Sequence, residues 1–213
     1  LSRMSYGISA QRYDASGSPV GSEFFINETE SGSQVDVRLA ALDNGGFAAV
    51  WSDSGNDGSG YGIFGRRFDA SGTAIDANDF QVNSAISGTQ ADAGITGLPD
   101  GGFIVTWTSA SASGDTSSYG VAGQRFDASG NKIGTEFLVN TTTANQQKYP
   151  YVTALDDGDF VVAWGSDLQA GDNSELGVYA QRFASPTPSG TATTTEHTVS
   201  TVTGSTTGEA PFG

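Results

Sequence analysis

The chain has 213 residues, and its 24 acidic and 9 basic side chains give a formal net charge of −15; it contains no cysteine. This charge excludes electrostatic attraction to nucleic acid and to anionic membrane surfaces. The lack of cysteine excludes disulfides, thiolate nucleophiles and cysteine-based zinc sites. The longest apolar runs are too short to span a bilayer, so the sequence predicts no membrane insertion.

A tyrosine-glycine segment recurs along the chain and defines a tandem repeat. It reads YGISAQRYDASG from residue 6, YGIFGRRFDASG from residue 61 and YGVAGQRFDASG from residue 119, and a shorter copy begins near residue 176. Three landmarks keep the same register in each repeat: Asn27, Gln34 and Trp51; Asn83, Gln90 and Trp107; Asn140, Gln147 and Trp164. We therefore assign residues 1–184 to a β-repeat domain and residues 185–213 to a tail.

Each repeat contains four predicted strands. The first strand covers residues 35–42, 91–98 and 151–155, and it ends in Asn-Gly or Asp-Gly turns that are typical of tight hairpins. The second, at residues 47–51, 103–107 and 160–164, is apolar at nearly every position, which predicts burial of both faces. The Tyr-Gly segment forms the third strand. The fourth follows the Asp-Ala-Ser-Gly turn, at residues 23–27, 79–83 and 136–140.

Four antiparallel strands in each repeat predict an all-β fold of tandem four-stranded antiparallel blades, similar to a β-propeller. The alternatives are an open β-solenoid and a sandwich of hairpins. The chain provides about three and a half blades, whereas propellers close with roughly four to eight. Two hypotheses account for this incomplete count. Either two chains associate and together supply about seven blades, or the chain is a piece of a longer array of repeats.

The tail from residue 185 to residue 213 is rich in Thr, Ser and Pro. This composition is typical of an extended linker. However, residues 196–202 include β-branched side chains that favour a strand. Such a strand would complete the last blade or pair with a neighbouring subunit as an exchanged strand.

The recurring GGFxxxW and YGIxxQRFDASG motifs resemble a repeat of very large bacterial secreted and surface proteins of the RTX and adhesin type. This resemblance covers about residues 5–183 and implies an extracellular location, at the bacterial cell surface, and an adhesive or structural role. The Asp-Ala-Ser-Gly turn also resembles, more loosely, the Asp-box of sialidase-type propellers. In that family the box is an element of the fold and lies away from the active site.

The arginines and the histidine do not predict a catalytic site. Four arginines occupy one equivalent repeat position, which favours a structural role, such as pairing with Asp14, Asp69 and Asp127: they are Arg12, Arg67, Arg125 and Arg182. The single histidine, His197, lies in the tail without a matching serine or aspartate motif. Carboxylates are plentiful but appear interchangeable, so no glycosidase pair can be selected. We therefore predict that the chain is not an enzyme and has no catalytic or cofactor-binding residues.

Two loops carry oxygen ligands of the kind that calcium prefers. The loop after the first tryptophan contains Asp53, Asn56 and Asp57, and the loop after the third contains Asp167 and Asp172. Ca²⁺ is therefore a candidate ligand. The alternative is that these residues only make soluble connections between strands, because their spacing differs between repeats.

Repeated loops also suit multivalent recognition of glycans. Five tyrosines could stack on sugar rings: Tyr61, Tyr119, Tyr149, Tyr151 and Tyr179. The function we predict is a non-enzymatic extracellular bacterial module for adhesion or for structural self-assembly through edge strands, with copies of itself as partners, as a homo-oligomer or a filament. The alternative is a lectin-like module that binds carbohydrate or depends on calcium.

Overall fold

The computed structural model describes residues 7–112, 114–115, 118–167, 177–184 and 193–201, and within these ranges the chain forms only strands and turns. Every paired strand is antiparallel to its neighbours. None of the described residues form a helix long and apolar enough to cross a membrane.

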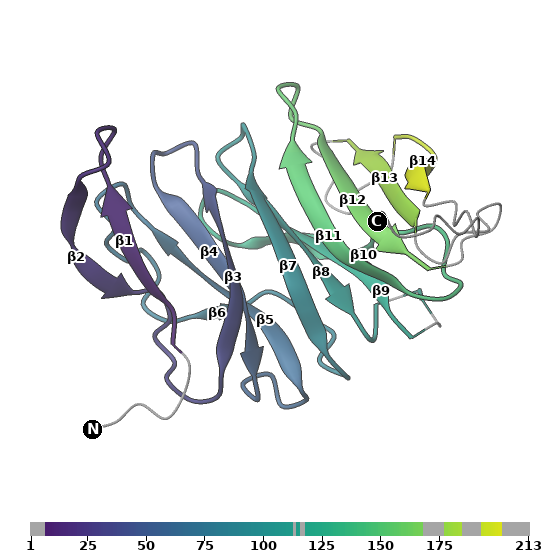
Figure 1. Cartoon of the computed structure of the whole chain (residues 1–213), viewed down its shortest axis with the longest axis horizontal. Helices are drawn as coiled ribbons and strands as arrows, with labels where there is room; N and C mark the ends of the chain where they lie inside the picture. The colour runs from purple at the N-terminus through teal and green to yellow at the C-terminus, as the bar shows by residue number, and fades with distance from the viewer. Residues whose placement is uncertain (1–6, 113, 116–117, 168–176, 185–192, 202–213) are drawn as a thin grey trace, which may run out of the picture.

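Three four-stranded sheets form successive blades (Figure 1). Blade 1 consists of β3 (Gln34–Ala41), β4 (Phe47–Ser54), β5 (Tyr61–Phe68) and β6 (Phe80–Gln81). Blade 2 consists of β7 (Gln90–Gly97), β8 (Phe103–Ser109), β9 (Gly120–Phe126) and β10 (Lys132–Leu138). Blade 3 consists of β11 (Gln147–Ala154), β12 (Phe160–Ser166), β13 (Gly177–Phe183) and β14 (His197–Thr201). A half-blade of β1 (Ser9–Tyr13) and β2 (Pro19–Phe25) precedes them.

The first strands of the blades, β3, β7 and β11, form an inner row in which β7 contacts both β3 and β11 (Figure 1). The other strands of each blade follow outward from this inner row. The prediction of propeller-like, four-stranded antiparallel blades is therefore confirmed.

Each blade packs one face on the blade before it and the other on the blade after it. We call the first the tryptophan face, represented in blade 2 by Phe103, Val105 and Trp107. We call the second the isoleucine face, represented in blade 1 by Val50 and Ile63, which pack against those three residues. Burial on both sides explains why the second strand of each repeat is apolar throughout, because neither of its faces contacts water.

The same arrangement recurs between blades 2 and 3, where Ile104 and Val121 pack against Trp164. In blade 3, however, the isoleucine face is uncovered within the described part of the chain. Strand β12 therefore alternates between buried and half-buried residues, whereas every residue of β8 is buried.

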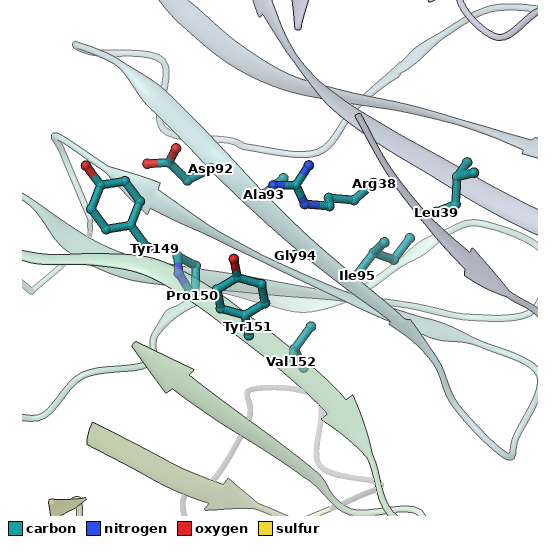
Figure 2. Close-up of a pocket in the computed structure, with 10 residues that line it drawn as sticks. All are labelled: Arg38, Leu39, Asp92, Ala93, Gly94, Ile95, Tyr149, Pro150, Tyr151 and Val152. Carbon is teal, nitrogen blue, oxygen red and sulfur yellow. The ribbon is translucent and has the colours of Figure 1, made fainter. Parts of the chain in front are cut away.

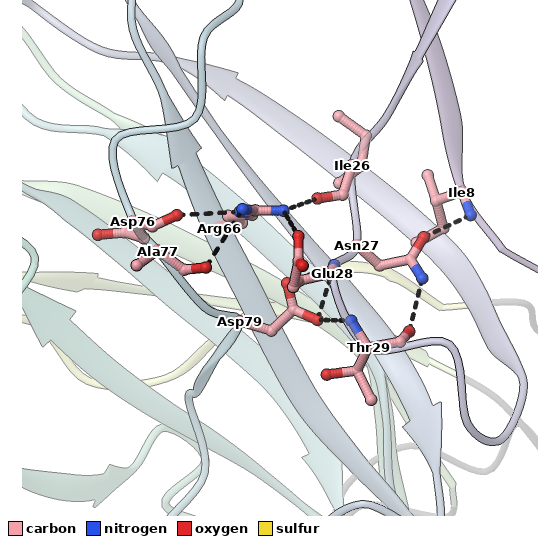
Figure 3. Close-up of polar contacts among 9 residues, drawn as sticks. All are labelled: Ile8, Ile26, Asn27, Glu28, Thr29, Arg66, Asp76, Ala77 and Asp79. Carbon is pink, nitrogen blue, oxygen red and sulfur yellow. Dashed lines mark hydrogen bonds and ion pairs between the residues drawn. The ribbon is translucent and has the colours of Figure 1, made fainter.

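A carboxylate in or just before each fourth strand bonds that blade to the preceding one. Asp79 accepts the backbone N–H groups of Glu28 (2.9 Å) and Thr29 (2.8 Å) from the segment after the half-blade (Figure 3). Glu136 accepts the N–H groups of Ser84 (2.7 Å) and Ala85 (3.3 Å) from blade 1. These bonds fix the spacing of neighbouring blades at their outer strands.

The tail supplies the corresponding residue for blade 3. Glu196 accepts the N–H groups of Thr141 (3.0 Å) and Thr142 (3.1 Å), and β14 pairs with β13 directly after it. The tail was predicted to be either a linker or a strand. Residues 197–201 form a strand that completes the last blade of the same chain. Residues 185–192 and 202–213 lie outside the described part.

The predicted pairing of the repeated arginines with the aspartates of the Asp-Ala-Ser-Gly turns is wrong. Asp69 accepts the N–H groups of Ser71 (2.8 Å) and Thr73 (2.9 Å) of its own turn, so its carboxylate is already used. Arg67 pairs with Asp76 instead. Its three counterparts likewise use other acceptors: Arg12 donates to the Ser71 carbonyl, Arg125 pairs with Asp100, and Arg182 pairs with Asp157 and Asp159.

Candidate functional site

The inner strands carry three β-bulges at equivalent positions. The register of each strand with its neighbour shifts between Val35 and Arg38, between Ala91 and Gly94, and between Lys148 and Tyr151. At each shift one non-glycine residue adopts a positive φ: Asp36 (56°), Asp92 (55°) and Tyr149 (58°). Such a conformation costs on the order of 1 kcal/mol at each residue and is concentrated at functional sites. A bulge also re-aims the side chain that it carries.

These bulges border a pocket of about 140 Å³ on the inner row of strands (Figure 2). Its lining is Arg38 and Leu39 of β3, Asp92–Ile95 of β7 and Tyr149–Val152 of β11. Figure 2 shows the Asp92 carboxyl group and the Tyr149 ring on one side, and the Arg38 side chain extending from β3 toward β7. All three blades therefore contribute to one site.

Asp92 provides the carboxyl group that lines this pocket. Its burial raises the pKa of the carboxyl group above the ordinary value of 3.8. A hydrogen bond from Thr108 opposes this effect and lowers the pKa. The negative charge of Asp36 raises the pKa, and the positive charges of Lys148 and Arg38 lower it. The net shift of the pKa is upward. Asp92 therefore holds a proton at higher pH than a solvated aspartate does.

Thr108 of β8 lies beside the site. Its buried hydroxyl oxygen accepts the backbone N–H of Tyr149 at 3.0 Å. The same residue lowers the pKa of the Asp92 carboxyl group. One side chain from blade 2 therefore holds the β11 bulge and acts on the acidic group.

The pocket combines polar groups with exposed aromatic surface. Tyr149 is 59% exposed and Tyr151 is 69% exposed, although both lie on a strand at the centre of the blades. Sites for small ligands characteristically pair aromatic walls with a few convergent polar groups. Of the other tyrosines considered for sugar stacking, Tyr179 is buried in the core and Tyr119 lies 4.1 Å from the Lys148 ammonium group.

Of the calcium candidates, Asp53 lies near the end of β4, and Asn56 and Asp57 follow that strand. Asp53 is buried and accepts hydrogen bonds from the side-chain amides of Gln34 (3.1 Å) and Asn56. Asp57 accepts the N–H of Ser59 (2.9 Å). Asp167 follows β12, and Asp172 lies outside the described residues. Among the residues described, no three acidic, histidine or cysteine side chains form a metal-binding group, and calcium binding here stays a prediction.

No protein-family model and no curated protein matches the chain, so its resemblance to bacterial surface repeats also stays a prediction. Solved structures do match. An endo-1,4-β-xylanase from Bacteroides thetaiotaomicron is 13% identical over 90% of this chain and 78% of that chain, with a TM-score of 0.49. A thermostable family-43 glycoside hydrolase is 7% identical over 87% and 70%, also with a TM-score of 0.49. An endo-arabinase from B. thetaiotaomicron is 16% identical over 80% and 62%, with a TM-score of 0.47.

These matches contradict the predicted non-enzymatic module for adhesion or self-assembly and its lectin-like alternative, because the matching proteins are glycoside hydrolases. The prediction that the chain is not an enzyme is contradicted by the same finding. Its reasoning failed because the carboxylates are not interchangeable: those of the turns bind their own backbone, whereas Asp36 and Asp92 occupy the inner bulges. The signal was present in the sequence, since both residues stand two positions after the repeated glutamine.

Proposed function

We propose that the pocket on β3, β7 and β11 is the active site of a carbohydrate-active hydrolase in which Asp92 is the proton donor. One observation carries this proposal. A half-buried carboxyl group with a raised pKa lies in a pocket between exposed tyrosines and an arginine. The proposal therefore depends on the geometry and electrostatics of the chain itself.

Hydrolysis of a glycosidic bond requires an acid that protonates the leaving oxygen. A carboxyl group does this near neutral pH only if its environment raises its pKa, as the burial of Asp92 does. Asp36 does not line the pocket, but it stands at the equivalent bulge of β3 and its charge acts on Asp92, so we propose it as the second carboxylate. In this mechanism Asp36 either activates a water molecule or attacks the sugar directly, and the anomeric configuration of the product distinguishes the two roles.

The remaining groups of the pocket suit a sugar chain. The exposed rings of Tyr149 and Tyr151 offer faces on which the C–H surface of a sugar ring packs. The Arg38 guanidinium offers several hydrogen-bond donors to hydroxyl groups. A net charge of −15 repels polyanions, so we propose a neutral polysaccharide as the substrate. The extracellular location predicted from the sequence accords with a polymer that cannot enter a cell.

The test is hydrolysis of neutral polysaccharides, measured as newly formed reducing ends. The panel includes xylan and arabinan, after which two of the matching enzymes are named. We expect Asp92→Asn to reduce kcat at least about 100-fold, because general acid catalysis contributes roughly 10²–10⁴. The matched control is Asp43→Asn, which removes an exposed carboxylate just beyond β3 and should leave the rate unchanged.

Two results would overturn the proposal. One is that the folded chain hydrolyses none of the polysaccharides, even where it binds one of them. The other is that Asp92→Asn retains the rate of the Asp43→Asn control.

A further inference from the structure

The side chain of Arg66 occupies the space between the half-blade and blade 1 (Figure 3). Its guanidinium group donates across this boundary to the Ile26 carbonyl (3.4 Å) and the Glu28 carboxylate (3.2 Å). Within blade 1 it donates to the carbonyls of Asp76 (3.1 Å) and Ala77 (3.5 Å). Arg66 is buried, so its guanidinium group both fills this boundary and satisfies the acceptors on its two sides.

The next boundary, between blades 1 and 2, contains a hollow of about 390 Å³. The residue at the position of Arg66 is Gln124, and the residue at the position of Glu28 is Ser84, so both side chains are shorter there. The Gln124 amide donates only within blade 2, for example to the Ile133 carbonyl at 3.2 Å. Blade 1 lines the hollow with Ser84 and Ala85, and blade 2 lines it with Gln124, Lys132, Gly134 and Glu136, among others.

Two buried oxygen atoms of this lining have no hydrogen-bond partner among the described residues: Gln124 Oε1 and Glu136 Oε1. Gln124 is 1% exposed. The Glu136 carboxylate accepts the N–H groups of Ser84 and Ala85 through Oε2 alone, whereas its counterpart Asp79 uses both oxygens at the preceding boundary. A buried acceptor without a donor is unfavourable, so the two atoms indicate a bound group that carries hydrogen-bond donors.

The charges of the lining favour a neutral occupant. The Lys132 ammonium group donates to Ser84 Oγ at 3.2 Å and so joins blade 2 to blade 1. Partial burial lowers the pKa of this ammonium group, and the negative charge of Glu136 raises it. The described lining thus holds one positive and one negative charge, which balance. A hydroxyl group suits such a site, because it can donate to Gln124 and Glu136 and accept from Lys132.

We propose that the hollow between blades 1 and 2 binds a neutral sugar residue, at a site separate from the pocket on β3, β7 and β11. The sugar hydroxyls donate to Gln124 Oε1 and Glu136 Oε1 and accept from Lys132, and its C–H groups pack on Ala85 and Gly134. The volume of about 390 Å³ lies within the range of small-molecule sites, roughly 300–1,000 Å³. Such a site holds a polysaccharide without cleaving it, so this inference does not depend on the proposed hydrolase activity.

The test is an NMR titration of the isotope-labelled chain with xylose, arabinose and glucose, each up to about 100 mM. The backbone amide signals of Gly134 and Glu136 should shift saturably with at least one sugar, with a Kd of about 1–10 mM. Gln124→Arg should place a guanidinium group in the hollow, as Arg66 does one boundary earlier, and raise that Kd at least about 10-fold. The matched control is Gln11→Arg, which makes the same change at the equivalent position of the half-blade and should leave the Kd unchanged.

Thermal melting of each variant verifies folding. The proposal is overturned if none of these sugars shifts the Gly134 and Glu136 signals, or if Gln124→Arg binds as tightly as the control. Guanidinium chloride, titrated in the same way, should bind more weakly than the best sugar; tighter binding would show a cation site and overturn the proposal as well.

Hydrolysis is measured separately from this binding. Asp92→Asn should keep the native Kd at the hollow, because Asp92 does not line it. Gln124→Arg should keep the native kcat on a short soluble oligosaccharide, because Gln124 does not line the pocket on β3, β7 and β11. A failure of the hydrolase proposal and a failure of the sugar site are therefore distinguishable.

Discussion

The ion pair between Arg67 and Asp76 offers a sharp test of how the blades are stabilised. Asp76 accepts the backbone N–H of Arg67 (2.9 Å) and two guanidinium hydrogen bonds, from Nε (3.1 Å) and Nη2 (2.6 Å). The two side chains are only 10% and 19% exposed. In Asp76→Ala the guanidinium would remain buried and keep the Ala128 carbonyl as its acceptor.

Removing one partner of a buried pair costs about 3 kcal/mol, because the other charge stays buried without compensation. For a chain of this size that lowers Tm by roughly 6–12 °C. The matched control is Asp157→Ala, which removes a partner of Arg182, the repeat equivalent of Arg67. Arg182 and Asp157 are 41% and 56% exposed, and Arg182 keeps Asp159. Exposed pairs contribute about 0–1 kcal/mol, so Tm should fall by no more than about 4 °C.

The assay is thermal unfolding of both variants at one protein concentration. Arg67→Met combined with Asp76→Leu should recover most of the lost stability, since replacing a buried ion pair with apolar residues is often neutral. Equal decreases in Tm for Asp76→Ala and Asp157→Ala would refute the reasoning, because burial would then not determine the cost.

Three further predictions concern the core, the tail and acid. Phe103→Ala should lower the free energy of unfolding by about 3–5 kcal/mol in urea titrations, because Phe103 is fully buried and stacks on Phe126 at 4.6 Å; a loss below about 1 kcal/mol would contradict this. Glu196→Ala should speed amide exchange in β14, because it removes the acceptor that holds the start of that strand to Thr141 and Thr142; unchanged exchange would mean that pairing with β13 alone holds β14. Burial raises the pKa of Asp53 above 3.8, so between this value and the raised pKa the native state binds more protons, and stability falls as pH rises. Asp53→Asn should flatten that part of the plot of Tm against pH, and an unchanged plot would refute the assignment.

Much of the fold follows from the repeat alone. The spacing from Asn27 to Gln34, kept in each repeat, reflects a contact: the side-chain amide of each asparagine donates to the glutamine side chain that begins the next blade, at 3.4, 3.1 and 3.3 Å. The tryptophans at matched positions are 0–1% exposed. Short-range patterns of this kind are visible in a sequence because the same contact is made several times.

Other features depend on how blades meet, which the pattern of one repeat does not contain. The arginine partners were missed because Arg67 reaches Asp76 beyond its own turn and Ala128 in another blade. The role of Glu196 was missed because it follows a Thr-rich tail and aligns with Asp79 and Glu136 only in three dimensions. Asp92 looked ordinary because its raised pKa arises from burial beside β11 and from the charge of Asp36, on another strand.

The hydrogen bond from the Arg67 guanidinium to the Ala128 carbonyl joins blade 1 to blade 2. This contact has a consequence for how many repeats such a chain can contain. The half-blade and blade 1 each carry an arginine that donates to the turn of the following blade, so a duplicate of blade 1 inserted after it would find both neighbours already matched. Blade 3 has no such turn after Phe183, and Arg125 of blade 2 pairs with Asp100 of its own blade instead. We therefore expect that whole repeats gained or lost between the half-blade and blade 2 would leave this contact between neighbouring blades matched.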